Sequence, residues 1–393
     1  MPEDQTVTKI TLRKTRETRV RSGHPWLYAS EIERVEGDQA AGIADIYSSK
    51  GTFLGRALYN PKSQISLRML TMHDEPIDAD FFARRIKTAW DYRKLFCDEN
   101  SCRAIYGEAD FLPGLVVDKF GDVLVMQVLS MGMEMWKGTL VDILAEVIRP
   151  AGIYERNDVP VRRLEGLEET TGLLYGTVPD RVEMRENGIL YSVDVKQGQK
   201  TGFFLDQKEN RAAIAPICKG ARVIDMFCHN GSFALNAAQY GAREVTGVDI
   251  SEDALVVARD NARANNLNVS FEAHNCFDLL RTLTERGEKY DVVILDPPAF
   301  TKTRQMTERA LRGYKEINLR GMKLVPDGGY LVSCSCSQHV DDAAFINMLN
   351  EAARDSKHKL RMIEFRTQAK DHPILPASPE TKYLKCAIMQ VFE

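Results

Sequence analysis

Several marks of common protein classes are absent from this sequence. Its 393 residues include eight cysteines, but no pair of them has the two-residue spacing that zinc fingers and ribbons require. Eight thiols in so long a chain do not make a disulfide scaffold, so reduced cysteines in a cytoplasm are expected. No apolar run approaches the ~20 residues that span a bilayer, and the polar start Met1–Gln5 does not fit a secretory signal. These absences predict a cytoplasmic protein without a membrane anchor or a metal site.

An excess of positive charge is also missing. The chain has 52 basic and 56 acidic residues, a net charge of −4, so it lacks the overall basicity typical of nucleic-acid-binding proteins. A polyanion would have to meet a local patch, and Lys9–Arg21 offers one, with six basic residues against one acidic residue. Read as a strand, this segment places Arg13, Arg19 and Arg21 on one face. We predict that Arg13, Arg16 and Arg19 contact RNA phosphates; a charged edge strand that resists pairing is the alternative.

Turn signals and hydrophobic periodicity divide the chain into three predicted domains. With 44% hydrophobic and 27% charged residues the chain is globular, and its length fits two or three domains. Residues 1–75 alternate short apolar segments with glycine turns, which indicates a small β-rich domain. Residues 76–185 combine helical stretches such as Asp80–Cys97 with a hairpin signal at Gly121-Asp122, which indicates a compact α+β domain. Residues 186–393 form the third domain.

The third domain alternates strands with helices. Its continuous apolar strands predict an α/β fold with a parallel sheet covered on both faces. Ligands of such sheets bind at the carboxyl ends of the strands, so chemical motifs are expected there. The expected strands are Arg222–Phe227, Glu244–Asp249, Val269–Ala273, Tyr290–Leu295 and Gly329–Ser333.

Acidic and polar residues follow the first three of these strands. Asp225 lies near the end of the first strand, shortly before Gly231, and Asp249 ends the second. A carboxylate at the position of Asp249 can accept both ribose hydroxyls of a nucleoside cofactor, although a helix cap is the alternative. Only one glycine is present, so a GxGxxG dinucleotide loop is not indicated. The candidate cofactor-binding residues at the strand ends are Asp225, Phe227, Asn230, Gly231, Asp249, Asn275, Asp278 and Pro297.

The fourth strand ends in an unusual segment, Asp296–Phe300, with two successive prolines. The prolines fix φ and remove backbone donors, which makes a rigid, extended exit from the strand. We expect the Asp296 carboxylate to face the pocket and the Phe300 ring to stack on an RNA base. A plain strand terminator is the alternative.

The fifth strand ends in a cysteine, Cys334, within Ser333–Cys336. A thiolate that adds to C6 of a pyrimidine makes C5 nucleophilic, which divides a difficult C5 methylation into easier steps. Cys334 would need a lowered pKa and access from the pocket. Asp296 would hydrogen-bond the ring N3 or the amino group. A small buried hydrophobe or half of a metal site is the alternative for this cysteine, and no residue is indicated as the acceptor of the C5 proton.

These motifs together resemble class I S-adenosylmethionine-dependent methyltransferases. Upstream of them, Lys200–Arg211 looks like the segment that precedes the first strand in ribosomal RNA methyltransferases and helps to close over the cofactor. This resemblance implies that S-adenosylmethionine is the cofactor and that Phe204, Gln207 and Arg211 contribute to its site. A role of the adjacent phenylalanines as core anchors alone is the alternative.

Over its whole length the chain resembles the family of large-subunit ribosomal RNA cytosine-5 methyltransferases of the methyltransferase I type. His24–Tyr28 is similar to that family's PUA domain, Tyr106–Asp118 and Tyr154–Val159 to its central domain, and Ser333–Ser335 to its catalytic segment. The resemblance implies an RNA-binding PUA domain, a central α+β domain and a Rossmann-like methyltransferase domain. It also implies ribosomal RNA as the partner and Cys334 in the place of the nucleophile.

Other functions remain open. Asp-Pro-Pro followed by an aromatic residue also occurs in guanine-N7 methyltransferases of ribosomal RNA, whose target nitrogen needs no thiolate adduct. A noncatalytic RNA-binding or ribosome assembly factor would not need Asp225, Asp249, Asp296 and Cys334 together. A small-molecule methyltransferase leaves the first 185 residues unexplained. The oligomeric state is also open, with a homodimer as one alternative.

Overall fold

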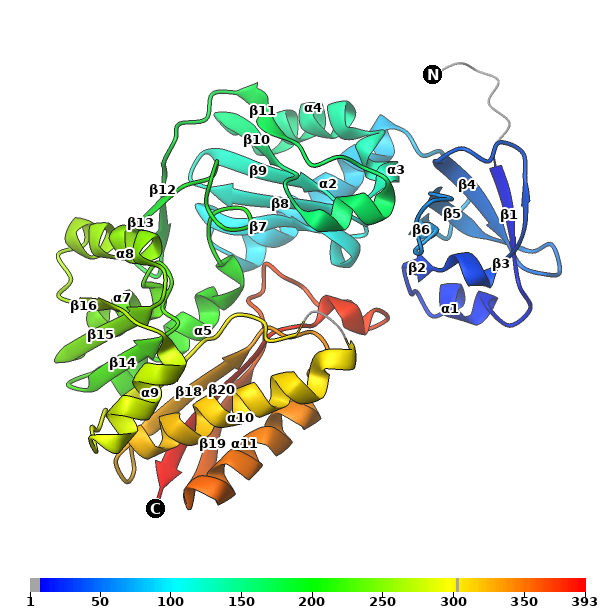
Figure 1. The fold of residues 1–393 in the computed structure, drawn as a ribbon. Helices are drawn as coiled ribbons and strands as arrows, with labels where there is room; N and C mark the ends of the chain where they lie inside the picture. Colours follow the sequence, from blue (N-terminus) through cyan, green and yellow to red (C-terminus); the bar gives the residue numbers. More distant parts are fainter. Residues whose placement is uncertain (1–7, 302–303) are drawn as a thin grey trace. The chain divides into compact units, whose positions relative to one another are not determined.

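The computed structural model describes residues 8–301 and 304–393, which fall into two compact units (Figure 1). The first unit takes in the chain up to Met184, together with Val193–Leu205 and Lys370–Thr381. The second unit consists of Arg185–Ser192, Asp206–Ala369 and Lys382–Glu393. No helix of the described residues is long and apolar enough to cross a membrane.

The first unit begins with a six-stranded sheet in the order β2-β6-β5-β4-β1-β3. Its inward-facing side chains, among them Ile10, Leu27 and Ile46, form a closed apolar core. Its elements are β1 (Thr8–Leu12), α1 (Glu17–Arg21), β2 (Trp26–Leu27), η1 (Ala29–Glu31), β3 (Ile32–Glu36), β4 (Gly42–Tyr47), β5 (Phe53–Tyr59) and β6 (Leu67–Thr71).

The predicted basic strand over Lys9–Arg21 is wrong. β1 ends at Leu12, the backbone turns through Thr15 with a φ of 75°, and the chain then forms the short helix α1. Arg13, Arg19 and Arg21 therefore do not share a strand face. The edge-strand alternative is wrong too, because β1 lies between β3 and β4. The spacing of the basic residues does not distinguish a strand from a helix. In α1, Arg21 lies 3.5 Å from Glu17, which is one helical turn earlier in the chain.

The rest of the first unit is a five-stranded sheet in the order β11-β10-β9-β8-β7, with helices packed against it. The expected helix Asp80–Cys97 is present as α2 (Ala79–Phe96), and its first turn is capped by Asp78, which accepts a hydrogen bond from the Phe81 amide at 2.8 Å. The hairpin around Gly121-Asp122 is confirmed as the antiparallel pair β8–β9. The remaining elements are β7 (Ser101–Tyr106), η2 (Gly107–Asp110), β8 (Leu115–Phe120), β9 (Val123–Val128), α3 (Met131–Glu134), α4 (Lys137–Ile148), β10 (Gly152–Arg156), η3 (Pro160–Glu165) and β11 (Thr171–Gly176).

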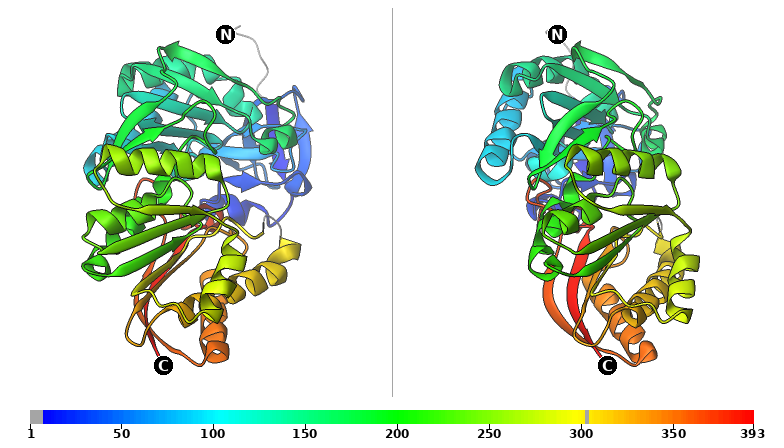
Figure 2. Two further views of the ribbon diagram at one scale, coloured as in Figure 1. Left: turned by 60° about the vertical axis from the view of Figure 1, so that its left-hand side comes forward. Right: turned by 90° about the vertical axis from the view of Figure 1, so that its left-hand side faces the viewer.

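The second unit is built on a seven-stranded sheet in the order β16-β15-β14-β17-β18-β20-β19. The five expected strands are present and run parallel, and α9, α10 and α11 share one apolar core on one side of the sheet (Figure 2). The bounds of the strands are β14 (Arg222–Met226), β15 (Glu244–Asp249), β16 (Ser270–Ala273), β17 (Val292–Leu295), β18 (Tyr330–Ser335), β19 (Lys359–Arg366) and β20 (Lys385–Phe392). The bounds of its helices are η4 (Leu205–Gln207), α5 (Lys208–Ala213), α6 (Ala215–Cys218), α7 (Ser232–Gln239), α8 (Glu252–Ala264), α9 (Cys276–Glu285), η5 (Arg304–Met306), α10 (Thr307–Leu324) and α11 (Asp342–Ser356). The short helix η6 (Pro379–Thr381), between β19 and β20 in the chain, belongs to the first unit.

The expectation of a wholly parallel sheet is wrong at one end. β20 pairs antiparallel with both β18 and β19, so the last two strands form a hairpin-like pair inside an otherwise parallel sheet. An antiparallel neighbour needs no crossover helix, and the chain from β19 to β20 accordingly passes through a loop without one. A separate two-stranded hairpin, β12 (Val182–Glu186) with β13 (Ile189–Val193), contributes residues to both units.

A buried carboxylate joins the six-stranded sheet to the rest of the first unit. Glu165, at the end of η3, is 3% exposed and accepts hydrogen bonds from Arg68 Nη2 at 2.8 Å and from Asn60 Nδ2 at 3.0 Å. Ser63 Oγ donates to the same carboxylate. Burial alone would raise the pKa of Glu165, but Arg68, Ser63 and Asn60 outweigh it and hold the pKa below its usual value.

We expect Glu165→Ala to lower the free energy of unfolding by about 3–5 kcal/mol, because it leaves the buried Arg68 guanidinium with only its longer contact to Glu108, at 3.4 Å. The depressed pKa means that this stabilisation is present above the ordinary pKa of glutamate and is lost as the pH falls through the lower value of the folded state. Urea denaturation at several pH values measures both effects. The control is Glu169→Ala, which removes an exposed ion pair with Arg163 and should cost less than about 1 kcal/mol. Equal losses for the two variants would contradict the assignment.

Candidate active site

Three aspartates meet at the carboxyl edge of the second sheet. β14 lies between β15 and β17 in parallel register, so Asp225 has Gly247 on one side and Ile294 on the other. The chain reaches Asp249 two residues after Gly247 and Asp296 two residues after Ile294. The neighbouring strand β18 brings Cys334 to the same edge. The placement expected for these four residues is therefore confirmed, whereas their roles stay predictions.

Asp225 has an unsatisfied acceptor atom. The residue is 1% exposed, and its Oδ2 accepts a hydrogen bond from the Ala234 amide at 2.9 Å in the first turn of α7. Its Oδ1 is buried and has no hydrogen-bond partner among the residues that the structure describes. Burial raises the pKa of Asp225 well above its usual value, and the charges of Asp296 and Asp249 raise it further. A cationic ligand group at Oδ1 would relieve both conditions.

Asp249 holds the loop that follows β14. Its Oδ2 accepts a hydrogen bond from the His229 amide at 2.8 Å, and its Oδ1 accepts one from the Ser251 amide at 2.9 Å. The cap of α8 is Ser251, whose side chain accepts from the Ala254 amide. Each carboxylate oxygen can accept a second hydrogen bond, so a role of Asp249 toward ribose hydroxyls is compatible with these contacts.

The loop from Phe227 to Gly231 has an unusual backbone. Phe227 and His229 have φ values of 66° and 50°. Residues other than glycine rarely adopt these backbone angles, which cost about 1–2 kcal/mol each. Gly231, with a φ of 78°, caps α7, and a Cβ at this position would lie 2.8 Å from the Phe271 ring. Packing against Phe271 therefore requires this glycine, a reason not foreseen from the sequence. Asn230 is buried within the same loop.

Asn275, two residues after the end of β16, is the N-cap of α9. Its side-chain oxygen accepts hydrogen bonds from the Phe277 and Asp278 amides at 2.9 and 3.4 Å, which leaves its amide NH2 group for other contacts. The Asp278 side chain is exposed in the first turn of α9. Two apolar residues beside these positions were missed: Ile250 is 72% exposed directly after Asp249, and Phe277 is 36% exposed. The signal was a large apolar residue one position after Asp249 and two positions after Asn275.

Asp296, Gln207 and Cys334 form a polar cluster. Gln207 Nε2 donates to Asp296 Oδ1 at 2.9 Å, and its Oε1 accepts from Asn210 Nδ2 at 2.7 Å. A hydrogen bond with Cys386, burial and the charge of Asp296 raise the pKa of Cys334 well above its usual value, while a hydrogen bond with Gln207 acts in the opposite direction. Cys334 is fully buried. The expected lowered pKa and open access of Cys334 are thus wrong.

Aromatic side chains surround the exit of β17. The Phe300 ring is partly buried, 5.7 Å from the ring of Phe277 and 4.5 Å from that of Tyr314. Stacking of Phe300 on an RNA base stays a prediction. Pro297 is buried, and its carbonyl oxygen lies 4.0 Å from Sγ of the partly exposed Cys336.

The segment upstream of β14 divides between the two units. Gln207 and Arg211 belong to the second unit, whereas Phe204 belongs to the first, where the Lys200 ammonium lies 4.6 Å from its ring centroid. Arg211 is 1% exposed and makes a bidentate ion pair with the fully buried Glu186, at 2.6 and 2.8 Å. This pair anchors the end of β12 beneath α5, so Arg211 has a structural function that the sequence did not indicate.

The three arginines predicted to bind RNA differ in their surroundings. Arg13 and Arg16 are exposed, and Arg13 donates from Nε to the Ile32 carbonyl at 3.1 Å. Arg19 is largely engaged: it hydrogen-bonds the His24 ring at 3.1 Å, lies over the Tyr28 ring at 5.0 Å and is 3.9 Å from Glu31. Arg13 and Arg16 are therefore the better candidates for phosphate contacts.

Comparison with known proteins places this geometry in a family. Residues 166–387 match the model of an S-adenosylmethionine-dependent methyltransferase family, and residues 10–72 match that of a PUA-like domain. "Ribosomal RNA large subunit methyltransferase I" of Tolumonas auensis is 42% identical over 98% of this chain and 99% of its own length, and the protein of that name from Shewanella frigidimarina gives the same figures. The chain belongs to this family. It is an S-adenosylmethionine-dependent methyltransferase with a PUA-like first domain.

Solved structures share the fold of this methyltransferase. A protein from Streptococcus mutans described as a SAM-dependent methyltransferase has a TM-score of 0.83 at 20% identity, over 98% of this chain and 100% of its own. A second methyltransferase structure, complexed with SAH, has a TM-score of 0.85 at 20% identity over the same shares. At this identity the likeness concerns the fold alone.

The residues of the sheet edge fit the cofactor of the methyltransferase. S-adenosylmethionine has a positively charged sulfonium and an ammonium group, and the buried Oδ1 of Asp225 is an acceptor without a partner among the described residues. The mutual repulsion of three neighbouring carboxylates, which contributes to the raised pKa of Asp225, would be offset by such a cation.

We expect Asp225→Asn to weaken S-adenosylmethionine binding by about 10- to 100-fold, the value of one hydrogen bond to a charged group. The raised pKa of Asp225 means that its contribution to folding stability is fully present below the ordinary pKa of aspartate and is lost as the pH rises through the folded-state value. The ligand-free variant should therefore retain stability at high pH that the wild type loses. Isothermal calorimetry and thermal unfolding from pH 5 to 9 measure the two effects.

The matched control is Asp260→Asn on the exposed face of α8. It should change neither cofactor affinity nor the pH dependence of unfolding. Unaltered cofactor binding by Asp225→Asn would show that Asp225 does not hold the cofactor.

Proposed function

We propose that this methyltransferase methylates C5 of a cytosine in large-subunit ribosomal RNA through a covalent adduct with Cys334. The observation that carries the proposal is the cluster of Cys334, Asp296 and Gln207 beside the candidate cofactor residues. The printed name of the full-length relatives supports ribosomal RNA of the large subunit as the substrate, and a PUA-like domain supports RNA in general.

The cofactor would lie along the ends of β14, β15 and β16. Asp225 would accept from its ammonium group and Asp249 from its ribose hydroxyls, while Ile250 and Phe277 offer apolar surface to the adenine. The free amide NH2 group of Asn275 is a donor for an adenine ring nitrogen. When bound, S-adenosylmethionine supplies an electrophilic methyl group.

Activation of Cys334 is coupled in this proposal to binding of the target base. The Asp296 charge is one of the causes that keep the thiol protonated. When Asp296 hydrogen-bonds the base, its charge is dispersed, and the thiol can ionise more easily. The sulfur then bonds to C6 while the thiol proton passes to N3, which yields a neutral enamine whose C5 is nucleophilic. After C5 has taken up the methyl group, it loses its proton to solvent, the C6–S bond breaks, and the N3 proton returns to the sulfur, which restores the aromatic ring and the Cys334 thiol.

Gln207 is a positioning residue in this scheme. Its Nε2 donates to Asp296 and its Oε1 accepts from Asn210, so both ends of the amide group have a partner and its orientation is fixed. A fixed Gln207 keeps the Asp296 carboxylate in one orientation at the carboxyl edge of the sheet.

One observation favours methylation of guanine N7 as the second candidate. Cys334 is fully buried with a raised pKa, a state that chemistry at a ring nitrogen would tolerate because it needs no thiolate. The two candidates are distinguished by which modified nucleoside is lost from ribosomal RNA in cells that lack the protein.

We expect cells that lack the protein to lose one 5-methylcytosine from large-subunit ribosomal RNA, as measured by mass spectrometry of its nucleosides. The wild type should restore it, whereas Cys334→Ala and Cys334→Ser should lower the rate of transfer by several orders of magnitude, because a nucleophile is lost. Cys336→Ser is the matched control and should retain activity. Loss of 7-methylguanosine with 5-methylcytosine unchanged would replace the proposal by guanine-N7 methylation.

We also expect the double variant Arg13→Gln/Arg16→Gln to bind ribosomal RNA more weakly and with a flatter salt dependence. Each lost phosphate contact should reduce the slope of log K against log salt by about 0.7–0.9, because fewer counterions are released. Arg19→Gln should instead lower thermal stability, since Arg19 is engaged within the domain. Lys50→Gln, an exposed cation in the β4–β5 turn, is the control. An unchanged salt slope would remove Arg13 and Arg16 from the RNA contact.

A further inference from the structure

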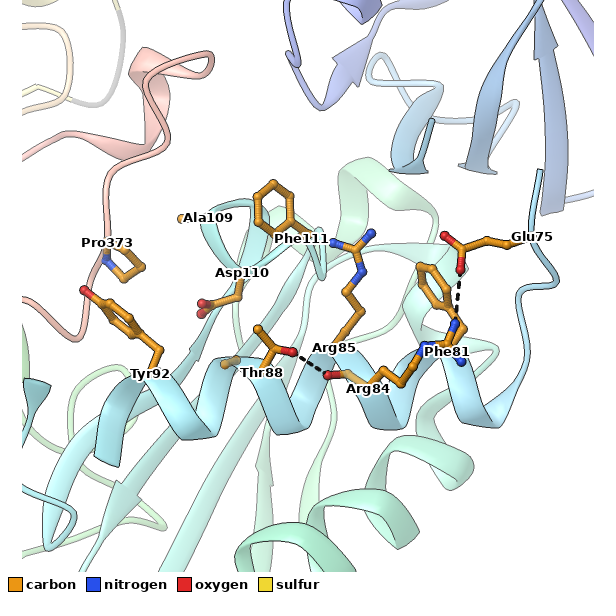
Figure 3. Close-up of a pocket in the computed structure, with 11 residues that line it drawn as sticks. Glu75, Phe81, Arg84, Arg85, Thr88, Tyr92, Ala109, Asp110, Phe111 and Pro373 are labelled. Atoms are coloured by element: carbon orange, nitrogen blue, oxygen red, sulfur yellow. Dashed lines mark hydrogen bonds and ion pairs between the residues drawn. The ribbon is translucent and has the colours of Figure 1, made fainter. Parts of the chain in front are cut away.

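The first unit contains a pocket that shares no residue with the strand-end site. It has a volume of about 580 Å³, within the roughly 300–1,000 Å³ of typical small-molecule sites. Helix α2 forms its floor, and the η2 turn and Pro373 rise beside it (Figure 3). The lining residues, all within the first unit, are Glu75, Phe81, Arg84, Arg85, Thr88, Ala89, Tyr92, Ala109, Asp110, Phe111 and Pro373.

The aromatic wall of this pocket is an exposed phenylalanine in a strained conformation. Phe111, which ends η2, has a φ of 58° and is 50% exposed. A bulky side chain in the left-handed region costs about 1–2 kcal/mol, and such outliers gather at functional sites. Half of a large apolar ring thus stays in water at a strained position, where the fold itself gains little from it.

The cationic wall consists of two consecutive arginines. The Arg85 guanidinium lies 5.1 Å from the Phe81 ring centroid and 5.2 Å from that of Phe111, and it donates to the Leu70 carbonyl at 3.0 Å. Its charge therefore lies against two rings, and Glu75 acts on it through space without a direct ion pair among the described residues. The exposed Arg84 pairs with Glu75 at 3.1 Å, an exposed ion pair that a phosphate can replace at little cost.

The acidic residues of the pocket are already engaged. Glu75 accepts from Arg84 and from Thr71 Oγ1, and Asp110 is paired with Arg93 and accepts from the Tyr106 amide. The exposed Arg84 uses one of its five N–H donors on Glu75, and no other contact of its guanidinium to a carboxylate is present among the described residues, so its remaining donors are open to a ligand. An exposed ring with a guanidinium against it, beside a second arginine, is the combination that stacks an unpaired base and contacts its phosphate.

We propose that this pocket binds one unstacked nucleotide of the RNA substrate, with its base on Phe111 and its phosphate at Arg84. This nucleotide is distinct from the one that is methylated, because the pocket is built from the first unit alone. The inference rests on the proposed action on RNA. A second cavity of about 210 Å³ shares Arg85 and Phe111 and is lined by Met69–His73 at the end of β6, which gives the neighbouring nucleotide a continuous path toward the PUA-like sheet.

The test compares Phe111→Ala with Phe96→Ala in the full-length protein. Phe96, at the end of α2, is as exposed as Phe111 at 50%, but it lies outside the pocket. The probes are a single-stranded uridine octamer and an RNA duplex, each measured by fluorescence anisotropy. Phe111→Ala should bind the octamer about 5- to 100-fold more weakly, the effect of one lost stacking contact, and Phe96→Ala should bind it like the wild type. Affinity for S-adenosylmethionine should be unchanged in both variants.

A second measurement needs no variant. Ultraviolet cross-linking of the wild type to a 4-thiouridine octamer should label the peptide that contains Phe111. Octamer binding that is unchanged in Phe111→Ala would overturn the proposal. Cross-links confined to fragments of the protein that lack Phe111 would overturn it too. Methyl transfer to deproteinised ribosomal RNA by the wild type, measured in parallel, separates this failure from a failure of the proposed function: only in the latter is transfer absent.

Discussion

Repulsion among three carboxylates at one sheet edge is the constraint on which the active site depends. Parallel strands in register lie about 4.8 Å apart, so Asp225, Asp249 and Asp296 cannot move away from one another without unpairing β14, β15 and β17. Backbone amides and the Gln207 side chain offset part of this charge, but one oxygen of Asp225 has no partner among the described residues. The site is thus arranged for a cation, and the folded protein carries the electrostatic cost until one binds.

The same charge governs the cysteine. Cys334 lies opposite the free Cys386 in the register of β18 and β20, and the negative charge of Asp296 acts on it. Both neighbours raise the pKa of its thiol and favour the protonated form. A protonated, buried thiol is a poor target for oxidants and alkylating agents, because the thiolate is the reactive form. Reactivity that appears only when a base occupies Asp296 would restrict the adduct to the proper substrate. The surroundings of Cys334 would therefore keep the proposed nucleophile inert until a base binds at Asp296.

The sequence was sufficient for features that depend on local order along the chain. Strands that end in Asp225, Asp249 and Asp296 could be predicted, since apolar runs followed by acids recur at the right spacing. Features set by partners far away in sequence could not. Nothing near Arg211 indicates that Glu186 neutralises it, and nothing near Cys334 indicates Cys386 on the adjacent strand. The alternating basic residues of the first domain led to the wrong prediction of one continuous strand. The backbone turn at Thr15, which ends the strand and precedes the helix, could not be seen in their spacing.

The first unit raises a different question, that of specificity. Phosphate contacts and stacking on an aromatic ring accept many sequences, because every nucleotide has a phosphate and every base has a face on which to stack. Neither the exposed Arg13 and Arg16 nor the pocket at Phe111 can select one nucleotide in a long RNA alone. Two weak sites in one unit, joined through Glu165, would gain affinity when an RNA reaches both at once and lose it when the shape of the RNA prevents this. Selection by the shape of the RNA would then leave base identity to the residues around Asp296, so the first unit would select the region of the RNA and the second unit the base.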